Sequence, residues 1–267
     1  MSAKVYTTIE ELDDLEEDAL DCTISQRLEA LQIVAAVFDL NGLDYGLIGG
    51  TNFFLRGSDR TTTDVDIAVT GRTSMAEVLE MLDHDPRITR PASDRPMLWV
   101  SGVARVFVLI DDTQNVQIDL KRQNTSHDFD AETELLPVDG SGEARVRFFK
   151  VGPLVKMKLR AHYIRESNDD YHDLRFACLD RRYGPLVKAA SQEYPYDDRA
   201  LFLDKVLENH PADEYLIRDV MNLVARSGEG SEESAGSEGH DERGGFYVAS
   251  GSGRARVGRS SSAESLT

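Results

Sequence analysis

The spacing of apolar residues changes twice along the chain, from helical to strand-like and back to helical. Between Thr23 or Ser25 and about Leu40, apolar residues recur every three or four positions, which predicts an amphipathic helix. The Asn41-Gly42 pair predicts its end, since both residues tolerate the left-handed backbone of a helix C-cap. Shorter runs that are rich in β-branched and aromatic residues, and are bounded by turn residues, predict strands. The expected strands cover residues 45–48, 64–69, 97–100, 104–110, 116–120 and 145–149.

Helical spacing dominates after Gly152-Pro153, and a proline suits the first turn of a helix. The order of elements therefore predicts an α+β fold: a mixed β-sheet with flanking helices, followed by a helical C-terminal half. The remaining expected helices cover residues 51–55, 73–82, 153–166, 169–180, 184–192, 198–209 and 212–226.

Composition sets both ends of the chain apart from the middle. Acidic residues crowd the first 22 positions, which predicts either a solvated helix face or a loose arm. From position 227 serine, glycine and charged residues dominate, so this tail cannot bury enough apolar surface to offset chain entropy and is expected to be disordered. The predicted segments are an acidic arm at 1–22, an α/β domain at 23–150, a helical domain at 151–226 and the tail at 227–267.

Charge and hydropathy argue against several classes of function. The formal net charge of −18 repels nucleic acid and anionic membranes, so a nucleic-acid substrate would need a local basic strip. No apolar run approaches about 20 residues, and the acidic N-terminus lacks the features of a signal or transit peptide. The two cysteines, Cys22 and Cys178, lie far apart, which favours a reduced intracellular compartment, the cytoplasm or the nucleus, over a disulfide framework or a zinc site.

Paired glycines end the expected strand at 45–48 and lead into the expected helix at 51–55. Glycine lets a phosphate approach the main chain, and the N–H groups at the start of a helix favour anions. Gly49, Gly50 and the adjoining Thr51 are therefore candidates for a phosphate-binding turn. The same glycine pair also fits an ordinary turn.

Three aspartates lie in expected strands. Residues i and i+2 of a strand point to the same face, so Asp64 and Asp66 place two carboxylates together, and like charges held together favour a bound cation. Asp119 adds a third carboxylate if its strand neighbours theirs, and three carboxylates can hold two divalent ions about 3.5–4 Å apart. Hard oxygen ligands of this kind suit Mg²⁺. The alternative is that these aspartates only cover solvent-exposed strand faces.

The text from Gly46 to Val69 resembles the nucleotidyltransferase superfamily that shares the fold of DNA polymerase β, and it is most similar to the AbiEii/MNT-like toxin branch. That family runs strand, Gly-Gly or Gly-Ser, short helix, arginine, Asp-x-Asp and later an acid in a strand. This chain has Gly50 at the position where the Gly-Ser form has serine. The residues that match, in order, are Gly49, Gly50, Arg60, Asp64, Asp66 and Asp119.

A second match lies in the helical half, and the resemblance as a whole covers roughly residues 44–180. The toxin-like branch has a helix with a lysine and an arginine, followed by a charged Asp-x-x-Asp-Leu helix. The resemblance implies that Lys158 contacts the triphosphate. It also implies that the other matching residues pair with one another or shape the cleft. The family often has Lys-Asp at the positions where this chain has Asp169-Asp170. The alternative interpretation is that these helices carry only a surface of salt bridges. The residues that match here are Lys158, Arg165, Asp170 and Asp173.

The resemblance implies a nucleotidyltransferase that depends on Mg²⁺ or Mn²⁺ and transfers a nucleoside monophosphate from a nucleoside triphosphate to a hydroxyl acceptor. The acceptor stays open between a small molecule, tRNA and a protein. A non-catalytic nucleotide-binding or interaction protein that keeps the fold is the alternative. The basic strip that tRNA would need comprises Lys150, Lys156, Lys158, Arg160 and Arg165. Catalysis and metal binding are expected of Asp64, Asp66 and Asp119. Nucleotide binding is expected of Gly49, Gly50, Thr51, Arg60, Lys158 and Arg165.

Overall fold

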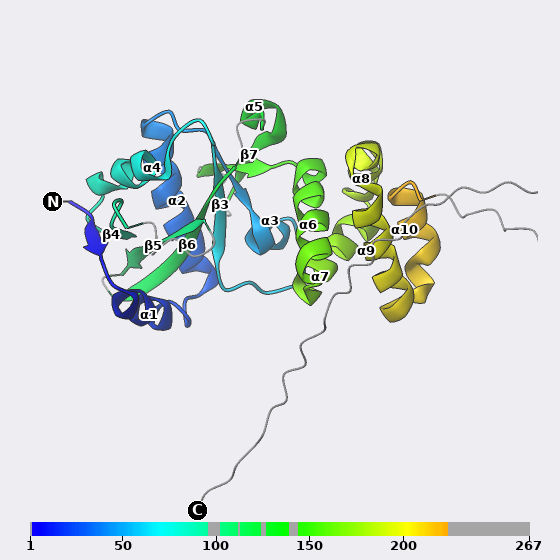
Figure 1. Ribbon diagram of the computed structural model, residues 1–267, viewed down its shortest axis with the longest axis horizontal. Helices are drawn as coiled ribbons and strands as arrows, with labels where there is room; N and C mark the ends of the chain where they lie inside the picture. Colours follow the sequence, from blue (N-terminus) through cyan, green and yellow to red (C-terminus); the bar gives the residue numbers. More distant parts are fainter. Residues whose placement is uncertain (1, 96–101, 112, 124–126, 139–143, 224–267) are drawn as a thin grey trace, which may run out of the picture. The chain divides into compact units, whose positions relative to one another are not determined.

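The computed structural model describes residues 2–95, 102–111, 113–123, 127–138 and 144–223 (Figure 1). Within these ranges the strands form one mixed eight-stranded sheet in the order β1-β4-β5-β6-β3-β2-β8-β7. The predicted α+β class is confirmed, because a central sheet with flanking helices is followed by a run of helices. The strands are β1 (Lys4–Tyr6), β2 (Tyr45–Ile48), β3 (Val65–Val69), β4 (Ile88–Pro91), β5 (Val103–Ile110), β6 (Gln114–Arg122), β7 (Thr133–Pro137) and β8 (Arg145–Phe149).

The helices follow the predicted order, except that the short helix at Phe129–Glu132 was not predicted. The last helix begins later than predicted, after a 3-10 turn over Pro211–Asp213, and it ends at Val220. The helices are α1 (Ile9–Asp18), α2 (Ile24–Leu40), α3 (Gly49–Leu55), α4 (Met75–Met81), α5 (Phe129–Glu132), α6 (Val151–Arg165), α7 (Asn168–Leu179), α8 (Gly184–Ala190), α9 (Tyr196–Asn209) and α10 (Glu214–Val220).

Helix α2 begins and ends where its sequence signals predict. Thr23 is the N-cap: its hydroxyl accepts a hydrogen bond from the Gln26 backbone N–H, and the Gln26 side chain accepts one from the Thr23 N–H. This reciprocal capping box satisfies two N–H groups that the helix cannot pair internally. At the other end Asn41 is the C-cap, and Gly42 has a φ of +63°, in the left-handed region that glycine adopts without strain.

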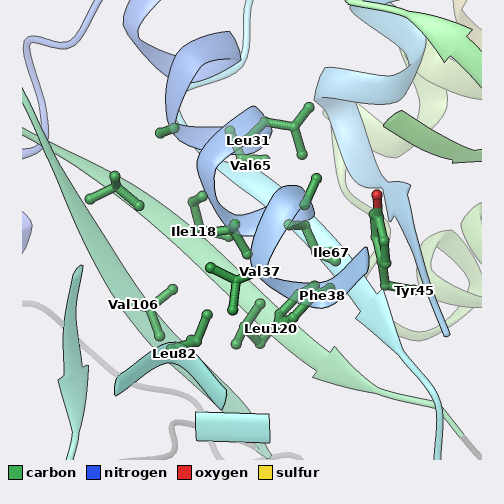
Figure 2. Packing of buried hydrophobic residues seen from close by; sticks show 14 of the residues in the cluster. Leu31, Val37, Phe38, Tyr45, Val65, Ile67, Leu82, Val106, Ile118 and Leu120 are labelled. Carbon is green, nitrogen blue, oxygen red and sulfur yellow. The ribbon is translucent and has the colours of Figure 1, made fainter. Parts of the chain in front are cut away.

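One face of the sheet packs against α2. Figure 2 shows Val65 and Ile67 of β3, with Ile118 and Leu120 of β6, clustered beneath this helix in the main hydrophobic core. Because side chains alternate along a strand, the residues between them on β3 and β6 face the opposite side of the sheet. That second face is where the candidate site lies.

The acidic first segment is a strand followed by a helix. Strand β1 pairs in parallel with β4 at the edge of the sheet, and Thr8 and Glu11 form a capping box at the start of α1. The buried side chains of Tyr6 and Leu12 pack with Phe107 of β5 in a small separate cluster. Of the two predicted alternatives for this segment, the acidic residues therefore lie on a helix.

Helices α6 to α10 enclose a second hydrophobic cluster, which extends to one face of β2 and β8. The two cysteines are free and buried, with Cys22 in the cluster beneath α2 and Cys178 in this second cluster. In the part of the chain that the structure describes, none of the helices is both long and apolar enough to cross a lipid bilayer. The predicted strand at 97–100 and the predicted disordered tail at 227–267 lie outside the described residues. The domain boundaries stay a prediction.

Candidate functional site

Three aspartate carboxylates converge where β3 and β6 lie side by side. The two strands are parallel with Asp66 opposite Asp119, and Asp64 directly precedes β3. One carboxylate oxygen of each residue lies within 4.8 Å of those of the other two. Asp66 and Asp119 are buried, and Asp64 is half-buried. The structure thus brings together the three acids that the sequence singled out, and we call this group the acidic triad.

The diglycine next to the triad leaves space for two charged side chains. Gly49 has a φ of +69°, and a Cβ atom built on it would lie 2.0 Å from Oδ2 of Asp66. A Cβ on Gly50 would lie 2.1 Å from Nη2 of Arg60. Side-chain contacts essentially never approach so closely, so a side chain at Gly49 would displace Asp66, and one at Gly50 would displace the end of the Arg60 side chain. This packing role of the two glycines is separate from the predicted approach of a phosphate to their main chain.

Replacing Gly49 with alanine is expected to displace Asp66 and to weaken Mn²⁺ binding by about 10- to 100-fold, the usual effect of disturbing the support of a metal ligand. The left-handed backbone adds a cost of about 1–2 kcal/mol in the free energy of unfolding. Calorimetric Mn²⁺ titration and denaturant unfolding measure the two effects. Gly42→Ala is the matched control, since Gly42 has a φ of +63° with no atom near its Cβ position. It should show the backbone cost alone, and equal Mn²⁺ binding by both variants would contradict this role of Gly49.

Burial and neighbouring cations set the charge of the triad. Burial raises the pKa of the Asp66 carboxyl, and the paired ammonium of Lys121 offsets only part of this effect. Burial likewise raises the pKa of Asp119, against the hydrogen bond that Gln117 Nε2 donates to its Oδ1 at 2.9 Å. Nε of Arg105 lies 3.4 Å from the same oxygen. Two carboxylates of the triad are thus each met by a cation of the protein.

The triad fits a divalent metal ion. Its three carboxylates supply the hard oxygen ligands that Mg²⁺ and Mn²⁺ prefer. Within the described ranges, the buried Oδ1 of Asp66 has no hydrogen-bond partner of ordinary geometry and is met only by the ammonium of Lys121. Desolvated carboxylates so close together are unfavourable without a compensating cation, so this donor set suits a metal.

Threonines hold the first acid of the triad in place. The Thr62 hydroxyl donates a hydrogen bond to Oδ1 of Asp64 at 2.9 Å, and the Thr51 hydroxyl donates one to the Asp64 backbone oxygen at 2.7 Å. Thr51 is fully buried. Its side chain therefore supports Asp64 in this structure, whereas the sequence predicted that it would contact phosphate.

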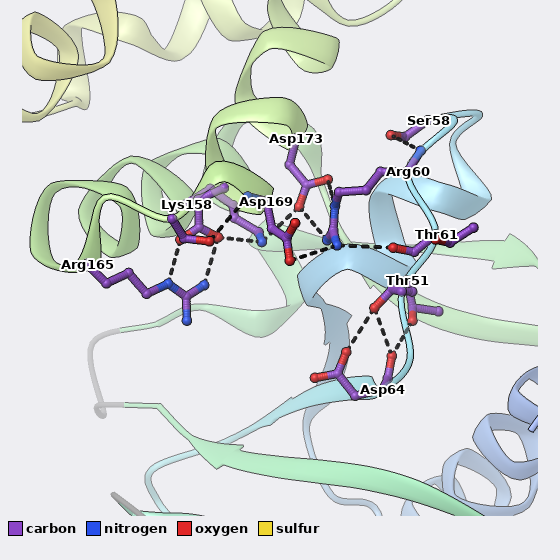
Figure 3. A network of polar contacts seen from close by, with 12 residues as sticks. Thr51, Ser58, Arg60, Thr61, Asp64, Lys158, Arg165, Asp169 and Asp173 are labelled. Atoms are coloured by element: carbon purple, nitrogen blue, oxygen red, sulfur yellow. Dashed lines mark hydrogen bonds and ion pairs between the residues drawn. The ribbon is translucent and has the colours of Figure 1, made fainter. Parts of the chain in front are cut away.

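An ion-pair network around two buried carboxylates, Asp170 and Asp173, joins the loop before β3 to helices α6 and α7 (Figure 3). Its outermost member, Arg165, has a side chain that is 58% exposed. Arg60 donates two hydrogen bonds of 3.0 Å to Asp173. Lys158 Nζ lies 2.8 Å from both Asp170 and Asp173. Arg165 donates bonds of 2.6 and 2.7 Å to Asp170. The pairing predicted for the second motif is thus present, and we call these five residues the buried network.

The buried network keeps its members charged. Burial disfavours the ammonium form of Lys158, but the Asp173 and Asp170 carboxylates outweigh this effect and raise its pKa. Burial also opposes the carboxylate form of Asp170, yet its bonds to Arg165 and Lys158 lower its pKa overall. Lys158 therefore stays a cation whose charge is already shared between two acids.

A cavity of about 610 Å³ lies between Asp66 of the triad and two residues of the network described above, Lys158 and Arg165, whereas Asp64 and Asp119 do not line it. Gly49 and Asp66 form part of its wall on the sheet side, and Lys158 and Arg165 form part of the wall on α6. Apolar side chains of α6, among them Met157, complete that wall. Among the described residues, three predicted nucleotide-binding positions do not line it: Gly50, Thr51 and Arg60.

Two cations of the site were not predicted from the sequence. Lys121 follows Asp119 by two positions on β6 and therefore shares its face of the sheet, so strand alternation alone could have identified it. Arg105 lies opposite Asp119 on the antiparallel strand β5, and it also pairs with Glu16 of α1. Only the strand register reveals this second neighbour.

Acids partly neutralise the predicted basic strip. Lys158 and Arg165 share the carboxylate of Asp170, and Arg160 lies 3.5 Å from Asp198. Charges that are already paired attract phosphate less strongly than free ones. The strip is thus a weaker nucleic-acid surface than its sequence predicts.

Comparisons with known proteins returned matches in structure alone. No protein-family model matches the sequence, and no curated protein matches it. Solved structures that match include an antigenic nucleotidyltransferase-like protein from Paracoccidioides brasiliensis, with 15% identity, coverage of 73% of this chain and 94% of that chain, and a TM-score of 0.45. Another is ANT(2")-Ia in complex with adenylyl-2"-tobramycin, with 13% identity, coverage of 67% and 98%, and a TM-score of 0.42. Similarity at this level assigns no activity to this chain.

Proposed function

We propose that this chain is a metal-dependent nucleotidyltransferase, which transfers a nucleoside monophosphate from a nucleoside triphosphate to a hydroxyl group. The observation that carries the proposal is the convergence of Asp64, Asp66 and Asp119 within 4.8 Å, with Asp66 on the wall of a cavity that has cationic side chains on its α6 wall. If the three aspartates only covered solvent-exposed strand faces, their carboxylates would have no reason to lie so close together. Buried carboxylates from two separate strands, with glycine packed against one of them, require a compensating partner.

In this proposal Asp64 and Asp66 would hold Mg²⁺ or Mn²⁺, and the Asp119 carboxylate beside them is left to accept a proton. A metal held there would neutralise charge on the triphosphate and on the departing pyrophosphate. Gly49 lines the cavity beside Asp66, where a phosphate would approach, and Lys158 and Arg165 line it from α6. Thr51 and Arg60 support the site without lining the cavity: Thr51 bonds to Asp64, and Arg60 bonds to Asp173. Gly50 contributes the space that Arg60 occupies.

Asp119 is our candidate for the general base. The acceptor oxygen forms a bond to the α-phosphorus as the bond to pyrophosphate breaks, and the hydroxyl proton passes to the Asp119 carboxylate. Burial raises the pKa of this group, which makes it a stronger base than an exposed aspartate. Gln117 and Arg105 hold the carboxylate in a fixed orientation.

For the acceptor we favour a small molecule over tRNA or a protein hydroxyl. The chain carries a net charge of −18, and acids already pair with part of the basic strip. On the residues of the two sequence motifs we also propose membership of the AbiEii/MNT-like toxin branch. We further propose a cytoplasmic location, with the nucleus as the alternative, in keeping with two free buried thiols.

Asp64→Asn and Asp66→Asn are each expected to abolish Mg²⁺-dependent binding of a nucleoside triphosphate while the fold stays intact. Asparagine keeps the size of the side chain but removes the charge that holds the metal. Titration calorimetry with each of the four triphosphates, in the presence and absence of Mg²⁺, measures the loss, and circular dichroism checks the fold. Binding like that of the wild type in both variants would refute the assignment.

A second function is favoured by the cations at the triad. Because Lys121 and Arg105 contact two of the three carboxylates, the chain could bind a nucleotide without transferring it. Incubation with each α-labelled triphosphate, Mg²⁺ and cell extract separates the two. A labelled acceptor supports the transferase, whereas Mg²⁺-dependent binding without any labelled acceptor supports a nucleotide-binding protein.

A further inference from the structure

Lys121 lies between the acidic triad and the cavity. Its Cα is in register with Ala68 of β3, two positions after Asp66 and on the same face of the sheet. From β6 the ammonium group of Lys121 pairs with Oδ1 of Asp66 on the neighbouring strand β3. Lys121 also lines the cavity, and its side chain is 33% exposed. It therefore has both a partner to leave and space to move into.

A metal ion that binds Asp66 through Oδ1 competes with Lys121 for this atom. Oδ1 of Asp66 is buried and is met by this ammonium alone among the described residues. A cation that coordinates this oxygen must displace the ammonium, because two positive charges at one carboxylate oxygen repel each other. Lysine is suited to such an exchange, since its charge sits on a flexible four-carbon stem.

We infer that Lys121 couples metal binding to triphosphate binding: it is the counter-ion of Asp66 before the metal arrives, and the displaced ammonium then binds a phosphate in the cavity. The inference rests on the proposed function. Lys158 and Arg165 on the α6 wall pair with Asp170, which lies outside the triad, so a metal at Asp66 would not take their partner. Lys121 alone exchanges a triad carboxylate for a phosphate, so it is a binding residue with two alternative partners.

Such an exchange must act in both directions. If the metal releases Lys121 to the nucleotide, then the nucleotide, by holding Lys121, equally strengthens metal binding at Asp66. Loss of the ammonium should therefore have opposite effects on the two ligands. The metal alone binds more tightly because it has no competitor, and the triphosphate binds more weakly because it loses a charge-assisted bond.

The test compares Lys121→Met with Lys156→Met. Lys156 lines the same cavity, so its replacement removes the same charge from the cavity without changing the partner of Asp66. Mn²⁺ binding without nucleotide is measured from the electron paramagnetic resonance of the free ion. Binding of α,β-methylene nucleoside triphosphates in saturating Mn²⁺ is measured by calorimetry. For Lys121→Met we expect Mn²⁺ to bind about tenfold more tightly and the analogue about tenfold more weakly.

For Lys156→Met we expect Mn²⁺ affinity to stay within about twofold of the wild type, because an exposed charge is screened. Lys121→Arg keeps the charge and should retain the wild-type pattern, which separates exchange from a change in packing. The inference is overturned if Lys121→Met binds Mn²⁺ no more tightly than the wild type, or if it binds the analogue equally well. In that case the proposed function still stands, provided that the wild-type protein binds Mn²⁺ and the analogue. If the wild-type protein does not bind Mn²⁺, or if Asp66→Asn binds it equally well, both the inference and the proposed function are overturned.

Discussion

Asp119→Asn is expected to slow nucleotidyl transfer by about 10²- to 10⁴-fold, the usual contribution of a general base. Asparagine has nearly the same shape, and its carbonyl oxygen can still accept the hydrogen bond from Gln117. It cannot take up the proton of the acceptor hydroxyl at neutral pH. The rate of release of labelled pyrophosphate, under single-turnover conditions with the acceptor found in cell extract, measures the effect.

The matched control is Asp204→Asn, because Asp204 is an exposed aspartate of α9, remote in sequence from the triad. It removes one negative charge from the protein and should leave the rate unchanged. Binding of the triphosphate to Asp119→Asn, checked by calorimetry, shows whether the site is still formed. A variant that binds nucleotide and transfers at the wild-type rate would exclude Asp119 as the base.

Asp173→Asn is expected to lower the free energy of unfolding by about 3 kcal/mol, a large part of the roughly 5–15 kcal/mol that stabilises a protein of this kind. The Asp173 side chain is 1% exposed and pairs with both Arg60 and Lys158. Removing its charge leaves two buried cations with one partner fewer, while the cost of their desolvation stays. Urea unfolding followed by circular dichroism measures the change.

Asp169→Asn provides a control on the same arginine. The Asp169 carboxylate lies 3.4 Å from Arg60, but its side chain is 68% exposed. Solvent screens such a pair, so this variant should change the free energy of unfolding by less than about 1 kcal/mol. Similar losses in the two variants would show that burial is not what makes the Asp173 pairs important.

The elements around the site could be predicted because their signals are local. Strand alternation placed Asp64 and Asp66 on one face, and the acid in an apolar run marked Asp119. Strands β1, β4 and β7 were missed. Strand β1 has only three residues, and β4 and β7 each end in a proline, which argues against a strand inside a sheet.

The partners of the charged residues could not be predicted in the same way. Arg60 pairs with Asp173, which lies 113 positions further along the chain, so this contact follows from the packing of α7 against α3. From the sequence alone, Arg60 was expected to bind nucleotide. Arg105 likewise reaches Asp119 only through the register of β5 and β6. Local patterns identify chemical groups, and tertiary packing decides which of them meet.

The two buried cysteines provide a way to follow how the protein opens. Cys22 belongs to the hydrophobic cluster beneath α2 and Cys178 to the cluster of the C-terminal helices, and burial raises the pKa of the Cys178 thiol. A thiol that is excluded from solvent reacts with an alkylating reagent only when the surrounding structure opens. Alkylation rates at the two positions, resolved by peptide mass spectrometry, would therefore report separately on the local unfolding of each cluster. No cysteine has to be introduced for this measurement, because each cluster already contains one.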